Sequence, residues 1–269
     1  MTEEPIREGN GLYDWQTAYG VDETVIIGFD HRLRLSQIPP PMLAWSLELC
    51  RIRIGSLNQN PHLKNIMFWT DGNNRVGKQG FVHPQWHITS ETTVYQRLLE
   101  EVGQCCDYFF IQDKQRCLLC DIMREEIKYQ ERLIVQTEYF LAFAPQGARY
   151  PFETWIVPRQ HQAYIENGQY TLGDLQELSS LIQGLLRQLE KVLGERFLFT
   201  LVLFNAPQRM SPTAFNQPSL SNLPTDFLSR AYHWRLRLKP LLGIGTLRED
   251  ATGECINPIL PEIAAGMLR

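Results

Sequence analysis

The sequence contains no apolar run that approaches the ~18 residues required for a membrane-spanning helix. Its start, MTEEPIREGN, is acidic and polar, whereas a secretory signal would be basic and then apolar. From these two absences we expect a cytoplasmic protein that does not enter a membrane. The 269 residues, 43% of them hydrophobic, can bury a substantial core as one large domain or as two halves.

An excess of basic residues is also absent. Lysine and arginine number 26 against 30 aspartates and glutamates, which gives a net charge of -4 and a pI near 5.9. We therefore expect no nucleic-acid partner, and any anionic ligand must be held by a local basic cluster. Cysteine is scarce as well. Six cysteines in a chain of this length, with no export signal, are better interpreted as thiols or metal ligands than as a disulfide framework.

The sequence of the first half predicts two strands, a helix and a ligand-binding loop. Apolar stretches at 23–27 and 64–69 predict the strands, and a proline suits the first turn of a helix over roughly 41–54. The loop DGNNRVGKQG has three glycines and two asparagines, which tolerate positive φ and let the backbone approach a ligand. Asn73 and Asn74 are therefore candidate substrate-binding residues. FVHPQWHITS predicts a further strand, and we expect Ser90 to cap the helix after it.

The second half repeats this order. RLIVQ, YFLAFAP, FETWIVP, FLFTLVLFN and YHWRLRLKP predict strands, because they are rich in β-branched and aromatic residues. Apolar residues at helical spacing predict a long helix over 171–193 that ends at Gly194, and PEIAAGMLR predicts a short closing helix. The two halves share an order of strands, a helix, a strand, a polar loop, and then a strand with histidine or basic residues at alternate positions. This indicates an internal duplication, with an N-terminal half over 1–110 and a C-terminal half over 111–269.

Three polar residues alternate along FVHPQWHITS. Positions i, i+2 and i+4 of a strand face the same way, so His83, Gln85 and His87 project together while Pro84 and Trp86 face the other side. Imidazole and amide groups on one face can hold phosphate oxygens, and one imidazole could attack phosphorus as a nucleophile. The alternative is a strand that merely has a polar face.

A cysteine pair opens the second half. Cys117 and Cys120 have the two-residue gap that lets both thiolates reach one tetrahedral zinc from a single turn. Two more ligands are required, and His161 and His233 are the only histidines later in the chain. The alternative is a pair of reduced, buried cysteines.

A second alternating row lies in YHWRLRLKP. His233, Arg235, Arg237 and Lys239 share one face of the expected strand, and such a row suits a phosphate or another polyanion. The alternative is the solvated face of an edge strand, which lysine commonly protects from further pairing.

These motifs together resemble the galactose-1-phosphate uridylyltransferase-like proteins of the histidine-triad superfamily. The resemblance is specific in RLIVQTEYFLAFAPQGARYPFETWIVPRQH, YHWRLRLKP and INPILPEIAA, and it is looser in the first half, at GLYDWQTAYGVDETVIIGFDHRL. It implies an α/β (α+β) fold of two duplicated histidine-triad-like units, each an antiparallel sheet with packed helices. It also implies a homodimer.

The resemblance implies an activity, but the active-site motif of this sequence departs from the motif of the family. Members of the family transfer a nucleoside monophosphate between a nucleotide sugar, or a dinucleoside polyphosphate, and a phosphate acceptor through the middle histidine of His-Pro-His-x-Gln. Here the motif reads His83-Pro84-Gln85-Trp86-His87. An amide is not a nucleophile at neutral pH, and His87 sits two residues on, roughly 6.6 Å along the strand.

We therefore predict a nucleotidyltransferase or phosphorylase that acts on a nucleotide sugar or a related nucleotide diphosphate. His87 is the candidate nucleophile or acid, His83 orients it and Gln85 binds phosphate. One alternative is an inactive relative that binds nucleotide or phosphate. Another is a zinc-stabilised subunit of a protein complex.

The resemblance also implies a metal site and further ligand contacts. The family's second-half zinc ligands match Cys117, Cys120, His161 and His233. A first-half site would need another cysteine pair, which the sequence lacks although His31 and His83 remain, so we predict one structural zinc. Arg235 stands where the family commonly has histidine, and Arg235 and Arg237 are candidate substrate-binding residues.

Overall fold

The computed structural model describes residues 6–10, 12–17, 19–30, 32–72, 83–110, 115–195, 197–208, 210, 226–242 and 252–269. Ten strands are present in this part of the chain: β1 (Arg7–Asn10), β2 (Tyr13–Gln16), β3 (Gly20–Ile26), β4 (Asn65–Gly72), β5 (Gln85–Glu91), β6 (Leu133–Gln136), β7 (Phe140–Phe143), β8 (Thr154–Pro158), β9 (Phe199–Phe204) and β10 (Arg235–Pro240). The helices are α1 (Pro40–Leu57), α2 (Gln96–Phe110), α3 (Leu118–Tyr129), α4 (Leu172–Leu193), α5 (Phe227–Ala231) and α7 (Pro261–Leu268), with short 3-10 turns η1 (Leu35–Gln37) and η2 (Ile165–Asn167). No helix among these residues has the length and apolar character to cross a membrane.

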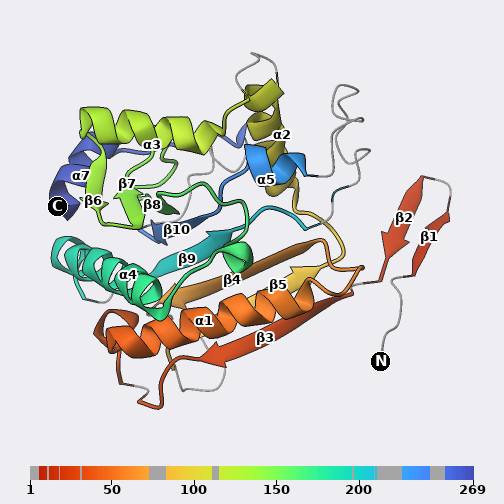
Figure 1. Ribbon diagram of the computed structural model, residues 1–269, viewed down its shortest axis with the longest axis horizontal. Coiled ribbons are helices and arrows are strands. Elements are labelled where there is room, and N and C mark those ends of the chain that lie inside the picture. Colours follow the sequence, from red (N-terminus) through yellow and green to blue (C-terminus); the bar gives the residue numbers. More distant parts are fainter. Residues whose placement is uncertain are drawn as a thin grey trace.

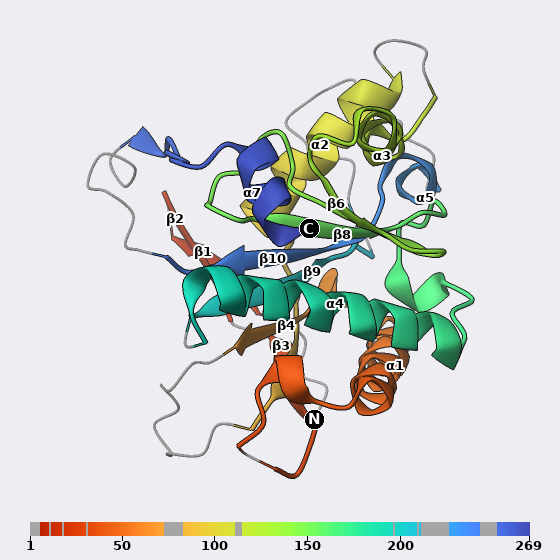
Figure 2. The same cartoon turned by 90° about the vertical axis from the view of Figure 1, so that its left-hand side faces the viewer.

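One antiparallel sheet of eight strands forms the centre of the molecule, in the order β3-β5-β4-β9-β10-β8-β7-β6 (Figure 1). The strands β1 and β2 form a separate hairpin that projects from one end (Figure 1). Helices α1 and α4 pack side by side on one face of the sheet, and α2 and α3 lie over the other (Figure 2). This arrangement confirms the predicted mixed class with antiparallel strands.

The sheet is built from a repeated unit. The first copy is β3-α1-β4-β5 and the second is β8-α4-β9-β10, and the two copies join where β4 pairs with β9. Trp69 of β4 is the register partner of both His87 in β5 and Val202 in β9, and Val202 is the partner of Arg237 in β10. His87 and Arg237 therefore occupy equivalent places on either side of the β4–β9 junction. The division of the chain at 110 and 111 stays a prediction, since strands of both halves share one sheet.

The main core lies between the sheet and the pair α1 and α4. Trp86 and Ile88 of β5, like Leu236 and Leu238 of β10, are fully buried on this side. Because side chains alternate along a strand, the intervening residues face the opposite side, toward α2 and α3. The two alternating rows noted in the sequence both lie on that second face.

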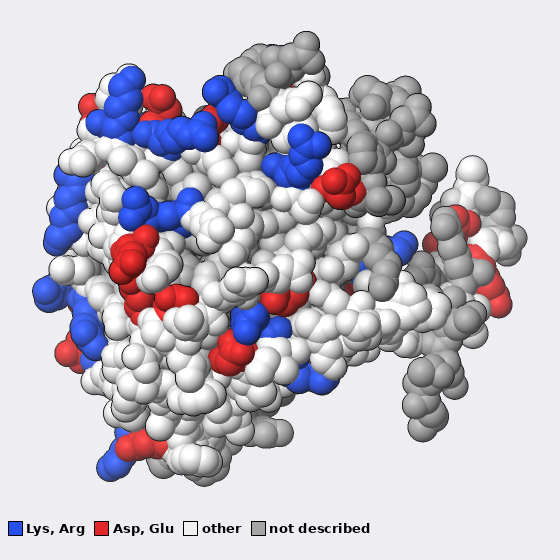
Figure 3. Space-filling view, viewed as in Figure 1, with Lys and Arg blue, Asp and Glu red and all other residues white. Residues whose placement is uncertain are grey.

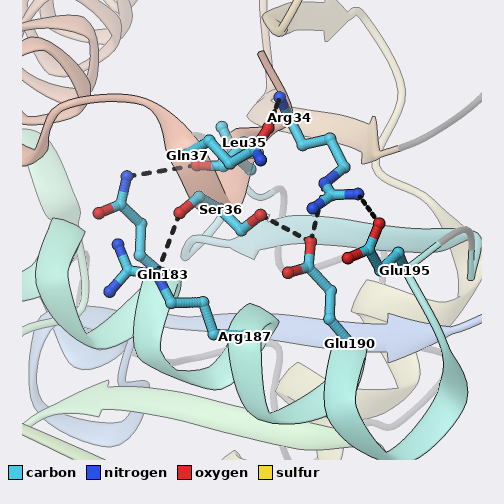
Figure 4. Close-up of polar contacts among 8 residues, drawn as sticks. All are labelled: Arg34, Leu35, Ser36, Gln37, Gln183, Arg187, Glu190 and Glu195. Atoms are coloured by element: carbon cyan, nitrogen blue, oxygen red, sulfur yellow. Dashed lines mark hydrogen bonds and ion pairs between the residues drawn. The ribbon is translucent and has the colours of Figure 1, made fainter.

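Polar contacts also tie the two copies together (Figure 4). From α4, the Gln183 amide donates to the carbonyl oxygens of Leu35 (3.3 Å) and Ile38, and Arg187 donates to that of Ser36 (3.2 Å). The Ser36 hydroxyl donates to Glu190 at 2.6 Å. These contacts satisfy the backbone at η1, which leads into α1, and so fix α1 against α4.

Most element boundaries agree with the sequence. Helix α4 begins after Thr171, whose hydroxyl accepts from the Asp174 backbone N–H, and it ends at Gly194, whose φ of 89° a side chain would strain. The prediction that Ser90 caps a helix is wrong. Ser90 lies within β5, paired with Val21 and Ile66, and α2 begins only at Gln96.

The face of the molecule in Figure 3 carries acidic and basic side chains interspersed, in keeping with the small net charge. Among the described residues, Glu153, Arg235 and Arg237 are charged residues buried in the second repeat.

Candidate functional site

Four side chains from distant parts of the chain meet beside the second repeat. Cys117 precedes α3 and Cys120 lies in its first turn, while His161 follows β8 and His233 precedes β10. Their ligand atoms all lie within 4.8 Å of one another. The Cys120 sulfur is 3.3 Å from Nδ1 of His161 and 3.4 Å from Nδ1 of His233. Two sulfurs and two imidazole nitrogens in this arrangement form a donor set typical of a structural zinc.

The outer nitrogens of the two histidines orient both rings toward this cluster. Nε2 of His161 lies 2.9 Å from the Ser229 carbonyl oxygen, and Nε2 of His233 lies 3.0 Å from that of Pro158. A carbonyl oxygen only accepts, so Nε2 carries the hydrogen and Nδ1 presents its lone pair to the sulfurs. Hydrogen bonding to Cys120 and to the two histidines lowers the pKa of the Cys117 thiol in spite of its burial. A metal ion binds the thiolate form, so this environment favours coordination.

The row on β5 has the predicted orientation. Gln85 and His87 are half-buried on the second face of the sheet, while Trp86 between them is buried in the main core. Nε2 of His87 lies 3.0 Å from the Gln85 amide nitrogen. Trp69 stacks on the His87 ring, with centroids 4.3 Å apart and planes at 18°. The stacking fixes the plane of the imidazole, and the hydrogen bond fixes which of its edges faces Gln85.

Gln85 thereby selects the proton position on His87. If its NH2 group donates to Nε2, the ring proton lies on Nδ1. If the amide is turned, its oxygen accepts from Nε2–H and the lone pair lies on Nδ1. The two orientations differ only in the assignment of the amide oxygen and nitrogen, which the hydrogen-bond network decides. The contact therefore couples the orientation of the Gln85 amide to the tautomer of the His87 ring.

The row on β10 does not form one basic patch. The Arg235 guanidinium is 6% exposed, and it donates from one terminal nitrogen to Glu101 Oε2 at 2.7 Å and from the other to Oε1. Trp155 and Phe204 cover the guanidinium, and the Tyr232 hydroxyl donates to Glu101 at 2.7 Å. Burial opposes the ionisation of Glu101, but the charge of Arg235 and these hydrogen bonds outweigh it and lower the pKa of the carboxyl.

Arg237 follows on the same face. Among the described residues it forms no ion pair, and its guanidinium lies over Phe204, 4.6 Å from the ring centroid. The interpretation of this row as a solvated edge is wrong, because β10 lies between β9 and β8. Its polar residues are buried under α2 and α3.

Comparisons with known proteins show which proteins this chain is similar to. No family model matches the chain. The galactose-1-phosphate uridylyltransferase of Thermotoga maritima is 24% identical over 266 residues, which cover 96% of this chain and 76% of that protein. The ADP-glucose phosphorylase of Arabidopsis thaliana is 26% identical over 254 residues, covering 93% of this chain and 64% of the relative. The chain is thus similar over most of its length to a galactose-1-phosphate uridylyltransferase and to an ADP-glucose phosphorylase, which supports a relationship to the galactose-1-phosphate uridylyltransferase-like proteins.

Solved structures of two similar proteins show the same fold as this chain. An ADP-glucose phosphorylase from Arabidopsis thaliana with bound ADP-glucose superimposes with a TM-score of 0.77 at 23% identity, over 93% of this chain and 73% of that one. A uridylyltransferase superimposes with a TM-score of 0.81 at 19% identity, over 100% of this chain and 80% of that one.

Not every candidate residue from the sequence lies in the part of the chain that the structure describes. Asn73, Asn74 and His31 lie outside the described residues. His83 is half-buried two positions before β5 begins. Two residues of the sites were missed: Trp69, which the alternation of β4 puts on the face of His87, and Glu101, for which the sequence offers no signal.

Proposed function

We propose that the protein is a nucleotidyltransferase or phosphorylase that takes a nucleoside monophosphate from a nucleotide sugar, with His87 as the nucleophile. Support comes from the two relatives, which are named for reactions of galactose 1-phosphate and of ADP-glucose and which align over most of this chain. The observation that carries the proposal is the setting of His87. Its ring is stacked on Trp69 and its tautomer is controlled by Gln85.

The orientation of Gln85 decides whether His87 can react. With the amide oxygen accepting from Nε2–H, the Nδ1 lone pair of a neutral ring attacks phosphorus and the bond from phosphorus to the sugar-phosphate oxygen breaks. The ring then carries the nucleoside monophosphate and a positive charge, which the amide oxygen stabilises through the same hydrogen bond. A phosphate oxygen of the acceptor attacks the same phosphorus and frees the ring. His83 is a candidate to bind substrate phosphates.

The test is direct observation of the intermediate. The protein is incubated separately with UDP-glucose and ADP-glucose, and its intact mass is recorded without acid, since phosphorus–nitrogen bonds are acid-labile. We expect an added nucleoside monophosphate that is absent in His87→Ala and retained in His62→Ala. His62 is a matched control because it lies in the turn before β4, packed edge-on against Tyr19. An adduct that persists in His87→Ala would refute the assignment.

A second candidate is a relative that binds nucleotides without turnover. The observation in its favour is that Gln85 occupies the nucleophile's place and can donate its NH2 group to the His87 lone pair, which would block attack. Saturable binding of the nucleotide sugars with no adduct and no product would select this candidate over the enzyme.

We further propose one zinc bound by Cys117, Cys120, His161 and His233. All four ligands come from the protein, so the site is closed and structural rather than catalytic. The metal would connect the start of α3 to the end of β8 and the start of β10. The cytoplasmic location stays a prediction.

We also propose a homodimer. Helix α1 faces the main core with one side, yet Met42, Trp45, Leu49 and Ile52 are exposed along its other side. They recur at spacings of three or four residues and so form one stripe. A second copy that covers this stripe would remove a contiguous apolar surface from water.

A further inference from the structure

A cavity lies in the second repeat, on the same face of the sheet as His87. It encloses about 240 Å³ between β8, β10, α2 and α3. Arg97 of α2, Arg149 of the loop before β8 and Arg237 of β10 line it, together with Glu153 and the Arg235–Glu101 pair. No residue of the β5 motif contributes to it.

Arg237 is the unusual group in this cavity. Its side chain is 9% exposed, and its Nε is buried without a hydrogen-bond acceptor. Within the described ranges it makes no ion pair, and its described contact is the Phe204 ring at 4.6 Å. Burial and the nearby charge of Arg97 lower the pKa of Arg237 to about 10, although the charge of Glu153 acts in the opposite direction, so the guanidinium remains charged at neutral pH. A buried guanidinium that is not in contact with a carboxylate is unfavourable, and an anionic ligand would relieve this cost.

The carboxylates in the cavity wall are already engaged. Glu101 receives both terminal nitrogens of Arg235. Glu153 accepts the Trp155 indole N–H at 3.0 Å and the Arg149 backbone N–H at 3.1 Å. Glu100, on the exposed side of α2, accepts from Gln96 at 3.2 Å. The guanidinium groups of Arg97, Arg149 and Arg237 are therefore left to face a common space.

The position of this cavity in the second repeat corresponds to the position of His87 in the first. Arg237 holds in β10 the place that His87 holds in β5, three strand spacings or about 14 Å across the sheet. We propose that this cavity is a second binding site, for the phosphate group of a small ligand, with Arg237 as its anchor and with Arg97 and Arg149 as further cationic contacts. Guanidinium groups match phosphate geometry through paired N–H donors. The volume is below that of typical pockets for larger ligands, about 300–1,000 Å³, which favours a phosphate with a small substituent over a whole nucleotide sugar.

The site is separate from His87, so it stands or fails independently of the proposed transferase activity. The test titrates the full-length protein with inorganic phosphate, glucose 1-phosphate and AMP by calorimetry, each at constant ionic strength. We expect saturable binding that Arg237→Met weakens by about 10- to 100-fold. His87→Ala should retain this binding, and so should Lys128→Gln, which removes a positive charge from the exposed end of α3. The three ligands distinguish free phosphate from a sugar phosphate and a nucleotide as the source of the group.

Thermal unfolding supplies a second readout that does not depend on measured affinity. An unpaired buried guanidinium should not stabilise the free protein, so Arg237→Met should unfold at the same or a higher temperature than the wild type without phosphate. With phosphate present, only the wild type should shift upward. The proposal is overturned if no ligand binds saturably, if Arg237→Met binds as tightly as the wild type, or if binding is lost in His87→Ala and kept in Arg237→Met.

Discussion

Replacement of Glu101 by glutamine tests the charge pair that organises the second face of the sheet. Arg235 is 6% exposed and both of its terminal nitrogens donate to Glu101. Glu101→Gln removes the counter-charge and leaves a buried guanidinium facing an amide, which has one oxygen in place of two. Loss of one partner of a buried pair costs about 3–5 kcal/mol of unfolding free energy. At roughly 2–4 °C per kcal/mol, the melting temperature should fall by roughly 6–20 °C.

Urea unfolding at pH 7, followed by tryptophan fluorescence, measures the effect. Glu100→Gln is the matched control, since it makes the same chemical change at the neighbouring, exposed position of α2 and should alter stability by less than about 0.5 kcal/mol. A variant that combines Glu101→Leu, Arg235→Met and Tyr232→Phe removes the pair and its dependent hydroxyl together. It should regain most of the loss, because an apolar set needs no counter-charge. A cost below about 1 kcal/mol for Glu101→Gln, or a combined variant as unstable as the single one, would refute the reasoning.

Three further predictions concern the metal, the pH response and the dimer. Metal analysis of protein purified without chelator should return about one zinc per chain, absent in Cys117→Ser and retained in Cys255→Ser, which alters an exposed cysteine; a metal-free wild type would contradict it. Because the pKa of Glu101 is lowered by folding, its stabilisation is present above about pH 4.3 and lost as the pH falls through the folded value. The stability gap between wild type and Glu101→Gln should therefore narrow below pH 4.3 and stay constant above it, as urea titrations at several pH values would show. Trp45→Glu should convert a dimer into a monomer in sedimentation experiments, whereas an unchanged mass would place the dimer contact elsewhere.

The alternation of side chains along strands was the most informative part of the sequence. It correctly placed Gln85 and His87 on one face of β5 with Trp86 on the other, because the period of two depends only on local backbone geometry. The long helix was equally readable from its apolar stripe and from Thr171 and Gly194 at its ends. The prediction of a helix cap at Ser90 failed because serine can either cap a helix or lie in a strand. In the structure Ser90 pairs with Val21 and Ile66 within the sheet.

Contacts between distant residues could not be derived from local patterns. Glu101 and Arg235 are 134 positions apart, and neither sequence neighbourhood indicates the other. The same holds for the order of the sheet, which makes β10 an interior strand and its polar face a buried one. The Cys117 and Cys120 spacing predicted half of the metal cluster. His161 and His233 were candidates because no other histidine follows the cysteine pair, and resemblance to a known family supported them. No local pattern connects them to Cys120, since 41 and 113 positions separate them from it.

Equivalent positions in the two repeats of the sheet carry side chains with different chemistry. His83, Gln85 and His87 correspond in order to His233, Arg235 and Arg237, across the junction at which Trp69 pairs with Val202. Imidazole can form a bond to phosphorus and guanidinium can only bind it, so a covalent step is possible at His87 and excluded at Arg237. Among the described residues, the one cluster of possible metal ligands includes His233, which immediately precedes β10. No corresponding cluster lies beside β5 in this part of the chain. The strand proposed to bind phosphate, β10, lies three strand spacings from the strand proposed to react with it, β5. His87→Ala should therefore abolish the covalent adduct and leave phosphate binding in the cavity intact, whereas Arg237→Met should weaken that binding and leave the adduct intact.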